Sequence, residues 1–369
     1  MSRLAIRVDY AAITDNVATL VRRAEGAQVM AVVKADAYGH GLVEAARAAR
    51  TGGAAWLGVA QPDEALTLRS AGDEGRIFTW LYGPEVKAAQ LMAAGIDLSV
   101  SSVDVLGAIM AAARESGRRA SIHICVDTGL GREGVEPAGL DELASLAKAA
   151  QDAGLIEVVG IWSHFAWADQ PGHATIDAQA EVFRSAAVDL ESHGLSPQIR
   201  HLANSAATLT RPDLHFDLVR PGIAVYGLPP VPDPDGGAWG LRPAMSVTSE
   251  LVLVKDVPAG QGVSYGHEYV TPIPTTLGLV AAGYSDGIMR SAGNTAEVAI
   301  RGRRYTIAGR VCMDQFVVDL GPATDCVVGD QVTLIGPDGP TAREWADAVG
   351  TIDYEIVCRF GGLRPKADA

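Results

Sequence analysis

Short apolar runs alternate with longer amphipathic stretches from residue 29 to about residue 220. The apolar runs are almost continuously hydrophobic, which is typical of parallel strands covered on both faces. Helix candidates lie between them at Pro62–Ala71, Val103–Ser116, Leu140–Ala153 and Ala174–His193. The predicted strands are Val29–Val33, Trp56–Val59, Ile77–Trp80, Leu98–Val100, Ser121–Val126, Val158–Trp162, Ile199–Leu202 and Phe216–Val219. Eight such repeats predict an α/β fold, an N-terminal (β/α)8 TIM barrel.

A doubly wound sheet is the alternative for the same alternation. Such a sheet rarely needs eight regular repeats, and it would carry a glycine-rich loop directly after its first strand. Here the first strand runs into Lys34 and Ala35 instead. The barrel is therefore the favoured fold, although the pattern leaves the other arrangement open.

The texture of the chain changes after Tyr226. Leu228–Gly240 is rich in proline, glycine and aspartate, and it is interpreted as a linker between domains. The strands predicted beyond it have alternating patterns and lie at Met245–Val254, Thr276–Ala281, Ala296–Ile300, Tyr305–Val311 and Phe316–Leu320, and only Thr341–Val349 looks helical. We expect a barrel domain over residues 1–235 and a mainly β domain, a small barrel or sandwich, over 236–369.

Composition narrows the classes of function. The 369 residues carry a formal net charge of −14, which offers no basic surface for nucleic acid or anionic membrane. No run of eighteen apolar residues occurs, and the first residues lack the apolar core of a signal peptide. The four cysteines form no C-x-x-C pair, so we expect no metal site and a cytoplasmic location.

Polar groups gather where the predicted barrel strands end, and in such barrels the active site is built from these loops. Strand ends lead to Lys34, Arg132, His164, Asn204-Ser205 and Arg220-Pro221-Gly222. The loops after the last two strands are the usual phosphate site of a barrel, where Ser205 and the backbone at Gly222 can donate hydrogen bonds. These residues imply a phosphate-bearing ligand with a lysine facing it, which suggests a Schiff-base enzyme, because a desolvated lysine can react with a carbonyl group.

Each of these residues also has a structural interpretation. A lysine that ends a strand is usually a solvated rim residue, His164 is as often a core histidine, and Asn204-Ser205 commonly caps the following helix. Arg132 lies between glycines, which suits either a surface loop or a backbone that approaches a ligand. Single residues therefore leave the function open.

Eight motifs in order give the chain a specific resemblance. They are AVVKADAYGHG around Lys34, DTGLGR (Asp127–Arg132), SHF (Ser163–Phe165), NSAA (Asn204–Ala207), RPGIAVYG (Arg220–Gly227), VSYG (Val263–Gly266), GYSDGIMR (Gly283–Arg290) and GRVCMDQ (Gly309–Gln315), and TIDYEIVCR with Tyr354 follows them. In this combination and order the chain resembles the alanine racemases, across both predicted domains.

The resemblance implies an enzyme that interconverts L-alanine and D-alanine with pyridoxal 5'-phosphate. Lys34 would carry the cofactor and, with Tyr265, move the α-proton from opposite faces. The residues implied to bind the cofactor are Lys34, Tyr38, His164, Asn204, Ser205, Arg220, Gly222, Ile223 and Tyr354, with Arg220 at the pyridine nitrogen and His164 behind it. Those implied to bind the substrate are Arg132, Met313 and Tyr284. The family also implies a homodimer in which Tyr265 and Met313 come from the partner, with a role in either supplying or degrading D-alanine.

One position departs from the family pattern. Many members have a lysine, often carbamylated, two residues before the aspartate of D-T-G, where it braces the arginine corresponding to Arg132. Here that position is Cys125, which forms no carbamate, so the brace is either absent or supplied otherwise.

Three alternatives share the barrel domain. A racemase of broader specificity, towards serine or basic amino acids, differs only in pocket size, which the sequence does not show. A decarboxylase would carry an acidic-cysteine motif where this chain has CMDQ. A non-enzymatic barrel that only binds pyridoxal phosphate would lack the second domain.

Overall fold

The computed structural model describes residues 4–362, which form two compact units. The first, here called the barrel unit, comprises Tyr10–Ala37 and Gly41–Arg242. The second, here called the β unit, comprises residues 4–9, 38–40 and 243–362. No helix in residues 4–362 is long and apolar enough to cross a membrane.

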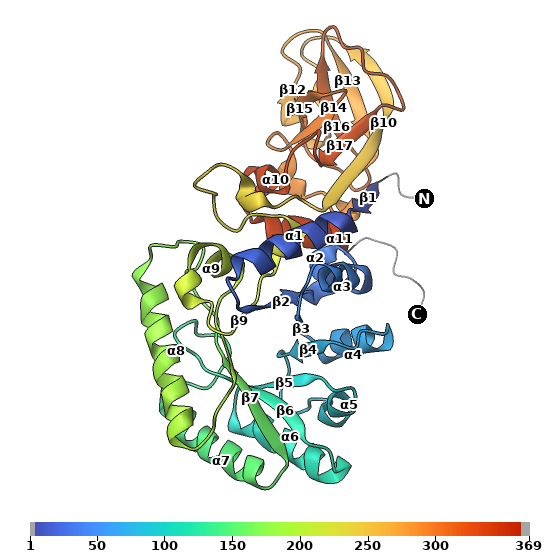
Figure 1. Ribbon diagram of the computed structural model, residues 1–369. Coiled ribbons are helices and arrows are strands. Elements are labelled where there is room, and N and C mark those ends of the chain that lie inside the picture. The colour runs from blue at the N-terminus through green and yellow to red at the C-terminus, as the bar shows by residue number, and fades with distance from the viewer. Residues whose placement is uncertain (1–3, 363–369) are drawn as a thin grey trace. The chain divides into compact units, whose positions relative to one another are not determined.

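The barrel unit contains the eight predicted parallel strands (Figure 1). They are β2 (Gln28–Val32), β3 (Trp56–Val59), β4 (Arg76–Thr79), β5 (Asp97–Val100), β6 (Ala120–Cys125), β7 (Ile156–Trp162), β8 (Ile199–His201) and β9 (Leu218–Val219). The sheet order is β8-β7-β6-β5-β4-β3-β2-β9, so its ends are the last two strands. The Asp217 amide donates to the Arg200 carbonyl at 3.1 Å and the Arg220 amide to the Ala203 carbonyl at 2.8 Å, which joins those ends. The predicted barrel is confirmed.

Helices cover the outside of the strands (Figure 1). They are α1 (Tyr10–Arg23), α3 (Leu42–Thr51), α4 (Pro62–Ser70), α5 (Ala88–Ala93), α6 (Val103–Ser116), α7 (Leu140–Asp152), α8 (Ala174–Ser192) and α9 (Ser205–Thr210). The four predicted helices are confirmed to within one residue at each end. Helix α6 shows why: Ser102 caps its first turn by accepting from the Val105 amide, and Gly117 ends it in the left-handed conformation.

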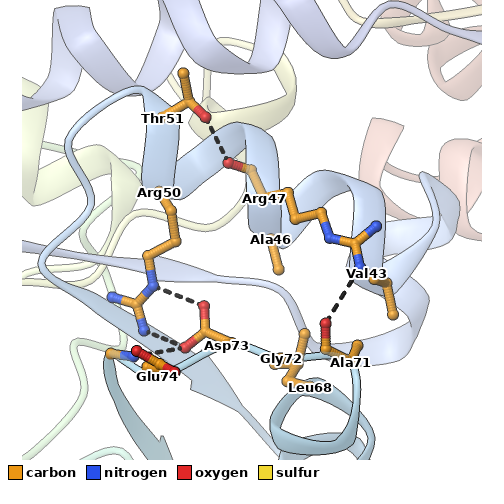
Figure 2. Close-up of a pocket in the computed structure, with 11 residues that line it drawn as sticks. Val43, Ala46, Arg47, Arg50, Thr51, Leu68, Ala71, Gly72, Asp73 and Glu74 are labelled. Carbon is orange, nitrogen blue, oxygen red and sulfur yellow. Dashed lines mark hydrogen bonds and ion pairs between the residues drawn. The ribbon is translucent and has the colours of Figure 1, made fainter.

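Two arginines of α3 fix that helix to the loop after α4 (Figure 2). Arg50 donates to both carboxylate oxygens of Asp73, at 2.9 and 2.8 Å, and Arg47 donates to the Ala71 carbonyl at 3.2 Å. These side chains line a pocket of about 360 Å³. Because both guanidinium groups are engaged, the pocket belongs to the scaffold of the barrel.

The segment predicted as a linker, Leu228–Gly240, folds as part of the barrel unit. Trp239 is buried, its indole donates to the Val231 carbonyl at 3.0 Å, and its amide donates to the Asp233 carboxylate at 2.6 Å. Glycine and proline make the turns here, but the buried side chains of Val231 and Trp239 hold these turns in place. The domain boundary at residues 235 and 236 falls inside this segment and stays a prediction.

The β unit is antiparallel and mainly β (Figure 1). Its sheet contains β10 (Met245–Val257), β13 (Thr275–Val280), β14 (Glu297–Ile300), β15 (Arg303–Thr306), β16 (Phe316–Gly321) and β17 (Gln331–Ile335), with β1 (Ala5–Val8) paired to β10. A ribbon of β11 (Gly262–Val263) and β12 (Tyr269–Val270) and the helices α10 (Ala342–Val349) and α11 (Asp353–Gly361) complete it.

Two expectations for this unit were wrong. The strand predicted over Tyr305–Val311 ends at Thr306, and only Ile307 continues it, by an isolated bridge to Val318. A second helix, α11, follows α10, with Ile356, Val357 and Phe360 buried at helical spacing. Nine residues with a single apolar face are a weak pattern, and the tertiary contact decides the outcome.

Candidate active site

Lys34 follows β2 at the carboxyl end of the barrel strands and opens an unusual turn, α2 (Lys34–Gly39). Ala35, Asp36, Ala37 and Tyr38 all have φ between 52° and 55°, so the turn is left-handed. Each such residue costs roughly 1–2 kcal/mol, because its Cβ crowds the next carbonyl. Three hydrogen bonds hold the turn in place: Ala35 N–H to Glu64 Oε1 at 2.6 Å, Ala37 N–H to the Val33 carbonyl at 2.8 Å, and Leu42 N–H to Asp36 Oδ1 at 2.7 Å.

Arg220, directly after β9, is buried and held from two sides. Its Nη2 donates to the Ser163 carbonyl at 2.7 Å and lies 3.3 Å from His164 Nδ1. Its Nη1 donates to the His201 carbonyl at 2.6 Å and lies 3.3 Å from His201 Nδ1. Burial lowers the pKa of Arg220 to about 10, so the side chain stays a cation at neutral pH. The structure thus brings Arg220 and His164 together.

A buried chain of side chains continues from Arg220 through the barrel. His201 Nε2 lies 2.8 Å from His123 Nδ1, and His123 Nε2 lies 3.1 Å from Asp97 Oδ2. Because an arginine only donates, His201 must accept at Nδ1 and donate at Nε2, and His123 then does the same towards Asp97. Both rings are therefore neutral and fixed in one tautomer. Asp97 also pairs with Arg76 at the start of β4.

Burial and neighbouring cations keep His164 neutral as well. Its desolvation, and then the positive charges of Arg220, Arg132 and Lys34, lower its pKa well below the usual 6.5. The positive charges of three predicted residues therefore act on this one ring. The Lys34 ammonium also lies 5.8 Å from the centre of the Trp80 ring.

The loops after β8 and β9 meet at Ser205. Its hydroxyl accepts from the amides of Gly222 at 2.8 Å and Ala224 at 3.3 Å. Asn204 accepts from the Ala207 amide at 3.1 Å and so caps α9, as the structural interpretation expected. A short helix, η3 (Ile223–Tyr226), starts here, and the amides of a first helical turn point away from the helix.

Arg132 lies on a tight loop after β6. The Asp127 carboxylate accepts from the amides of Gly129, Leu130 and Gly131 at 2.9 to 3.1 Å, which closes the loop. Arg132 forms a two-bond ion pair with Glu133, from Nε at 2.9 Å and from Nη2 at 2.7 Å. Cys125 is buried beneath, and burial followed by the charge of Glu133 raises the pKa of its thiol.

In the β unit, three predicted residues lie on loops that are tied together. Ser264, before Tyr265, donates to the Arg310 carbonyl at 2.7 Å, and the amide of Tyr284 donates to the Cys312 carbonyl, next to Met313, at 3.0 Å. The exposed fractions of Tyr265, Met313 and Tyr284 are 71%, 54% and 39%. All three side chains are therefore exposed on loops that hydrogen bonds hold in place.

Two family models match the chain over almost its full length. The model for the N-terminal domain of alanine racemase matches residues 8–230, and the model for its C-terminal domain matches residues 244–367. The chain belongs to the alanine racemase family.

Several alanine racemases are similar to this chain over almost its full length. The alanine racemase of Salinispora tropica is 53% identical over 367 residues, which cover 99% of this chain and 97% of that protein. The alanine racemase of Mycobacterium bovis is 46% identical over 354 residues, 95% of this chain and 92% of that protein. The solved alanine racemase of Streptomyces coelicolor superposes with a TM-score of 0.94 at 50% identity, covering 97% of this chain and 96% of that one.

The remaining alanine racemase motif residues, Tyr38 and Tyr354, both lie in the β unit. Their ring centres are 6.1 Å apart, and burial, with Tyr354 and Cys358 nearby, raises the pKa of Tyr38. The sequence interpretation missed the buried His123, His201 and Asp97. The signal that could have found them is a histidine inside each of two predicted inner strands, since buried polar groups need partners.

Proposed function

We propose that the protein interconverts L-alanine and D-alanine. The observation that carries the proposal is identity of about half of all residues to alanine racemases over the full chain. The electrostatics support it, because the positive charges of Lys34, Arg132 and Arg220 all act on a neutral His164 at the carboxyl ends of the barrel strands. A group of cationic side chains that includes one amine suits the carboxylate of an amino-acid substrate.

The donor set of the barrel unit fits pyridoxal 5'-phosphate. Ser205 and the amides at the start of η3 lie where barrels bind phosphate, and Gly222 lets the backbone approach closely. Arg220 can donate to a pyridine nitrogen, and Lys34 provides the amine that would join the aldehyde. Asn204, Ile223, Tyr38 and Tyr354 would complete the set. When bound, this cofactor supplies an electron sink for the α-carbanion of the amino acid.

Proton transfer would be divided between two residues. Lys34 would remove the α-proton of D-alanine, and Tyr265 would remove that of L-alanine. In each direction the other residue would donate a proton to the opposite face of the α-carbon. Arg220 would donate to the ring nitrogen without protonating it, because an arginine stays a cation and has only donors. Its contacts with His164 and His201 would hold the guanidinium in place. The α-carbon would then be reprotonated quickly.

The substrate site would combine residues of the barrel domain and of the C-terminal domain. Arg132 would bind the carboxylate, with Met313 and Tyr284 beside it. We propose a homodimer with shared sites, in which the C-terminal domain of one subunit gives Tyr265 and Met313 to the other. The exposure of this loop cluster supports the proposal, because a contact surface of that kind is rarely left open. We further propose a cytoplasmic location and a role in making D-alanine.

The test is to incubate the purified protein with pyridoxal phosphate and each L-amino acid in turn, and to measure the D-enantiomer. We expect D-alanine as the main product, its loss when the cofactor is removed, and its absence with Lys34→Ala. Serine and the basic amino acids are the informative competitors. Equal turnover of several of them would replace alanine racemase by the broader-specificity alternative, and no D-product at all would refute the proposal.

A further inference from the structure

The loop that carries Arg132 is unusually constrained. Besides the three amides on Asp127, the Asp127 amide donates to the Val135 carbonyl and the Val135 amide donates to the Cys125 carbonyl, both at 2.9 Å. Gly134 lies in the left-handed region, at φ +111°, and a Cβ there would come 2.5 Å from the Asp127 amide. Arg132 and Glu133 therefore lie on a loop whose ends are held together by these hydrogen bonds.

Glu133 holds one edge of the Arg132 guanidinium. Its two oxygens accept from Nε and Nη2, which is the side edge of the planar group. The opposite edge, Nη1 with the second proton of Nη2, has the same spacing and suits a second carboxylate. The side chain of Arg132 is 53% exposed, whereas that of Glu133 is 21% exposed. The acid is thus the more buried member of the pair and the arginine the more exposed one.

Glu133 also supplies a negative charge to a cation-rich cleft. Its charge acts on Arg220 and on Cys125 as well as on its direct partner. The residue beneath it, Cys125, is a buried thiol that brings no charge of its own. Glu133 is therefore the carboxylate that the structure places against Arg132 on this loop.

We propose that Glu133 is a positioning residue that orients Arg132 for the carboxylate of the substrate. The acid takes the side edge of the guanidinium and leaves the end of the fork facing the ligand. The inference rests on the proposed function in so far as Arg132 binds the substrate carboxylate. It assigns to Glu133 the task of bracing this arginine, which Cys125 cannot perform.

The test uses two simple ligands of the cofactor-loaded enzyme, each of which carries only one of the two charged groups of alanine. Propionate is alanine without its amine, and ethylamine is alanine without its carboxylate. We expect Glu133→Ala to weaken propionate binding, measured by calorimetry, by about 3- to 30-fold, the range for losing charge-assisted hydrogen bonds at a partly exposed arginine. Glu133→Gln, which keeps one acceptor oxygen, should fall between. The binding of ethylamine, seen in the absorbance of the cofactor, should not change.

Kinetics give an independent readout. KM for both enantiomers of alanine should rise by a similar factor, with kcat within about threefold, because the interaction is made equally before and during the reaction. Glu136→Gln removes the same charge from an exposed position on the same segment and serves as the control. In an Arg132→Ala background, Glu133→Ala should have no further effect on propionate binding.

Several outcomes would overturn the assignment. Unchanged propionate binding in folded Glu133→Ala, verified by its melting temperature, would show that Arg132 needs no brace. Tighter propionate binding would show that Glu133 merely competes with the ligand for the arginine. If the wild type binds propionate but racemises no amino acid, the proposed function fails while the pairing of Glu133 and Arg132 can still be judged from binding.

Discussion

Acidification should destabilise the protein through two buried histidines. Burial and the positive charge of Arg220 lower the pKa of His164 and of His201 well below 6.5, so both stay neutral in the folded chain. In the unfolded chain each ring takes up a proton near pH 6.5. Because the unfolded state binds more protons, the free energy of unfolding has its highest value above that pH and falls as the pH drops below it.

The size of the effect follows from linkage. Each histidine that remains neutral costs about 1.4 kcal/mol of stability per pH unit below 6.5. If both stay neutral, the loss between pH 6.5 and pH 5 amounts to about 3 kcal/mol, against a total stability of about 5–15 kcal/mol for a typical protein. The chain from Arg220 to His201, His123 and Asp97 opposes protonation further, because it fixes a donor opposite His201 Nδ1.

Urea unfolding followed by circular dichroism between pH 5 and 8, at fixed ionic strength and protein concentration, measures this slope. His201→Gln should lower the stability at pH 8 but reduce the slope by about 1.4 kcal/mol per pH unit. His193→Gln is the control, since the side chain of His193 is 22% exposed, and a hydrogen bond to the Asp189 carbonyl and the pairing with Asp141 raise its pKa instead of lowering it. A slope as steep in His201→Gln as in the wild type would refute the reasoning.

Three further outcomes are expected. Tyr265→Phe should keep the cofactor absorbance but lower racemisation by about 10²–10⁴-fold, and mixing it with Lys34→Ala under subunit exchange should restore activity if the dimer shares its sites. Gly361→Ala should destabilise the protein by about 1–3 kcal/mol in urea unfolding, because its Cβ would meet backbone at 2.1 Å, whereas Gly107→Ala, with open space on a helix, should be neutral or stabilising. Activity should not depend on bicarbonate, since the thiol of Cys125 forms no stable carbamate; a clear rise would point to a carbamylated lysine elsewhere.

The barrel could be predicted because its signals are local. Strands such as Val29–Val33 are continuously apolar, and helices such as α6 carry a cap at each end, so each element is specified by its own residues. Strand β1 has only four residues with an alternating pattern, and its partner β10 lies more than 200 residues away. Helix α1 was not predicted, although Ile13, Val17 and Leu20 follow helical spacing, because it precedes the first continuous apolar run, at which the alternation of strands and helices begins.

Some features of the site could likewise be predicted from the sequence, and others could not. Arg220 and His164 stand at strand ends, and the register of a barrel brings such positions together. The pairing of Arg132 with Glu133 was not foreseen, because adjacent residues seldom share two hydrogen bonds and only a closed loop makes this possible. The orientation of the buried histidines depends on which way each inner strand faces, which a three-residue strand such as β8 does not reveal.

The pairing of β1 with β10 has a consequence for how the chain is made. At about 5–20 residues per second, roughly 12–50 s pass between the emergence of β1 from the ribosome and that of its partner. During that time the barrel strands can assemble, while the first strand waits without a sheet to join. A fragment that starts at Pro243 would lack this strand, so an expression plasmid for the second unit alone should also encode residues 4–9. An affinity tag at the amino terminus would burden the unit made last, not the barrel that follows it in the sequence.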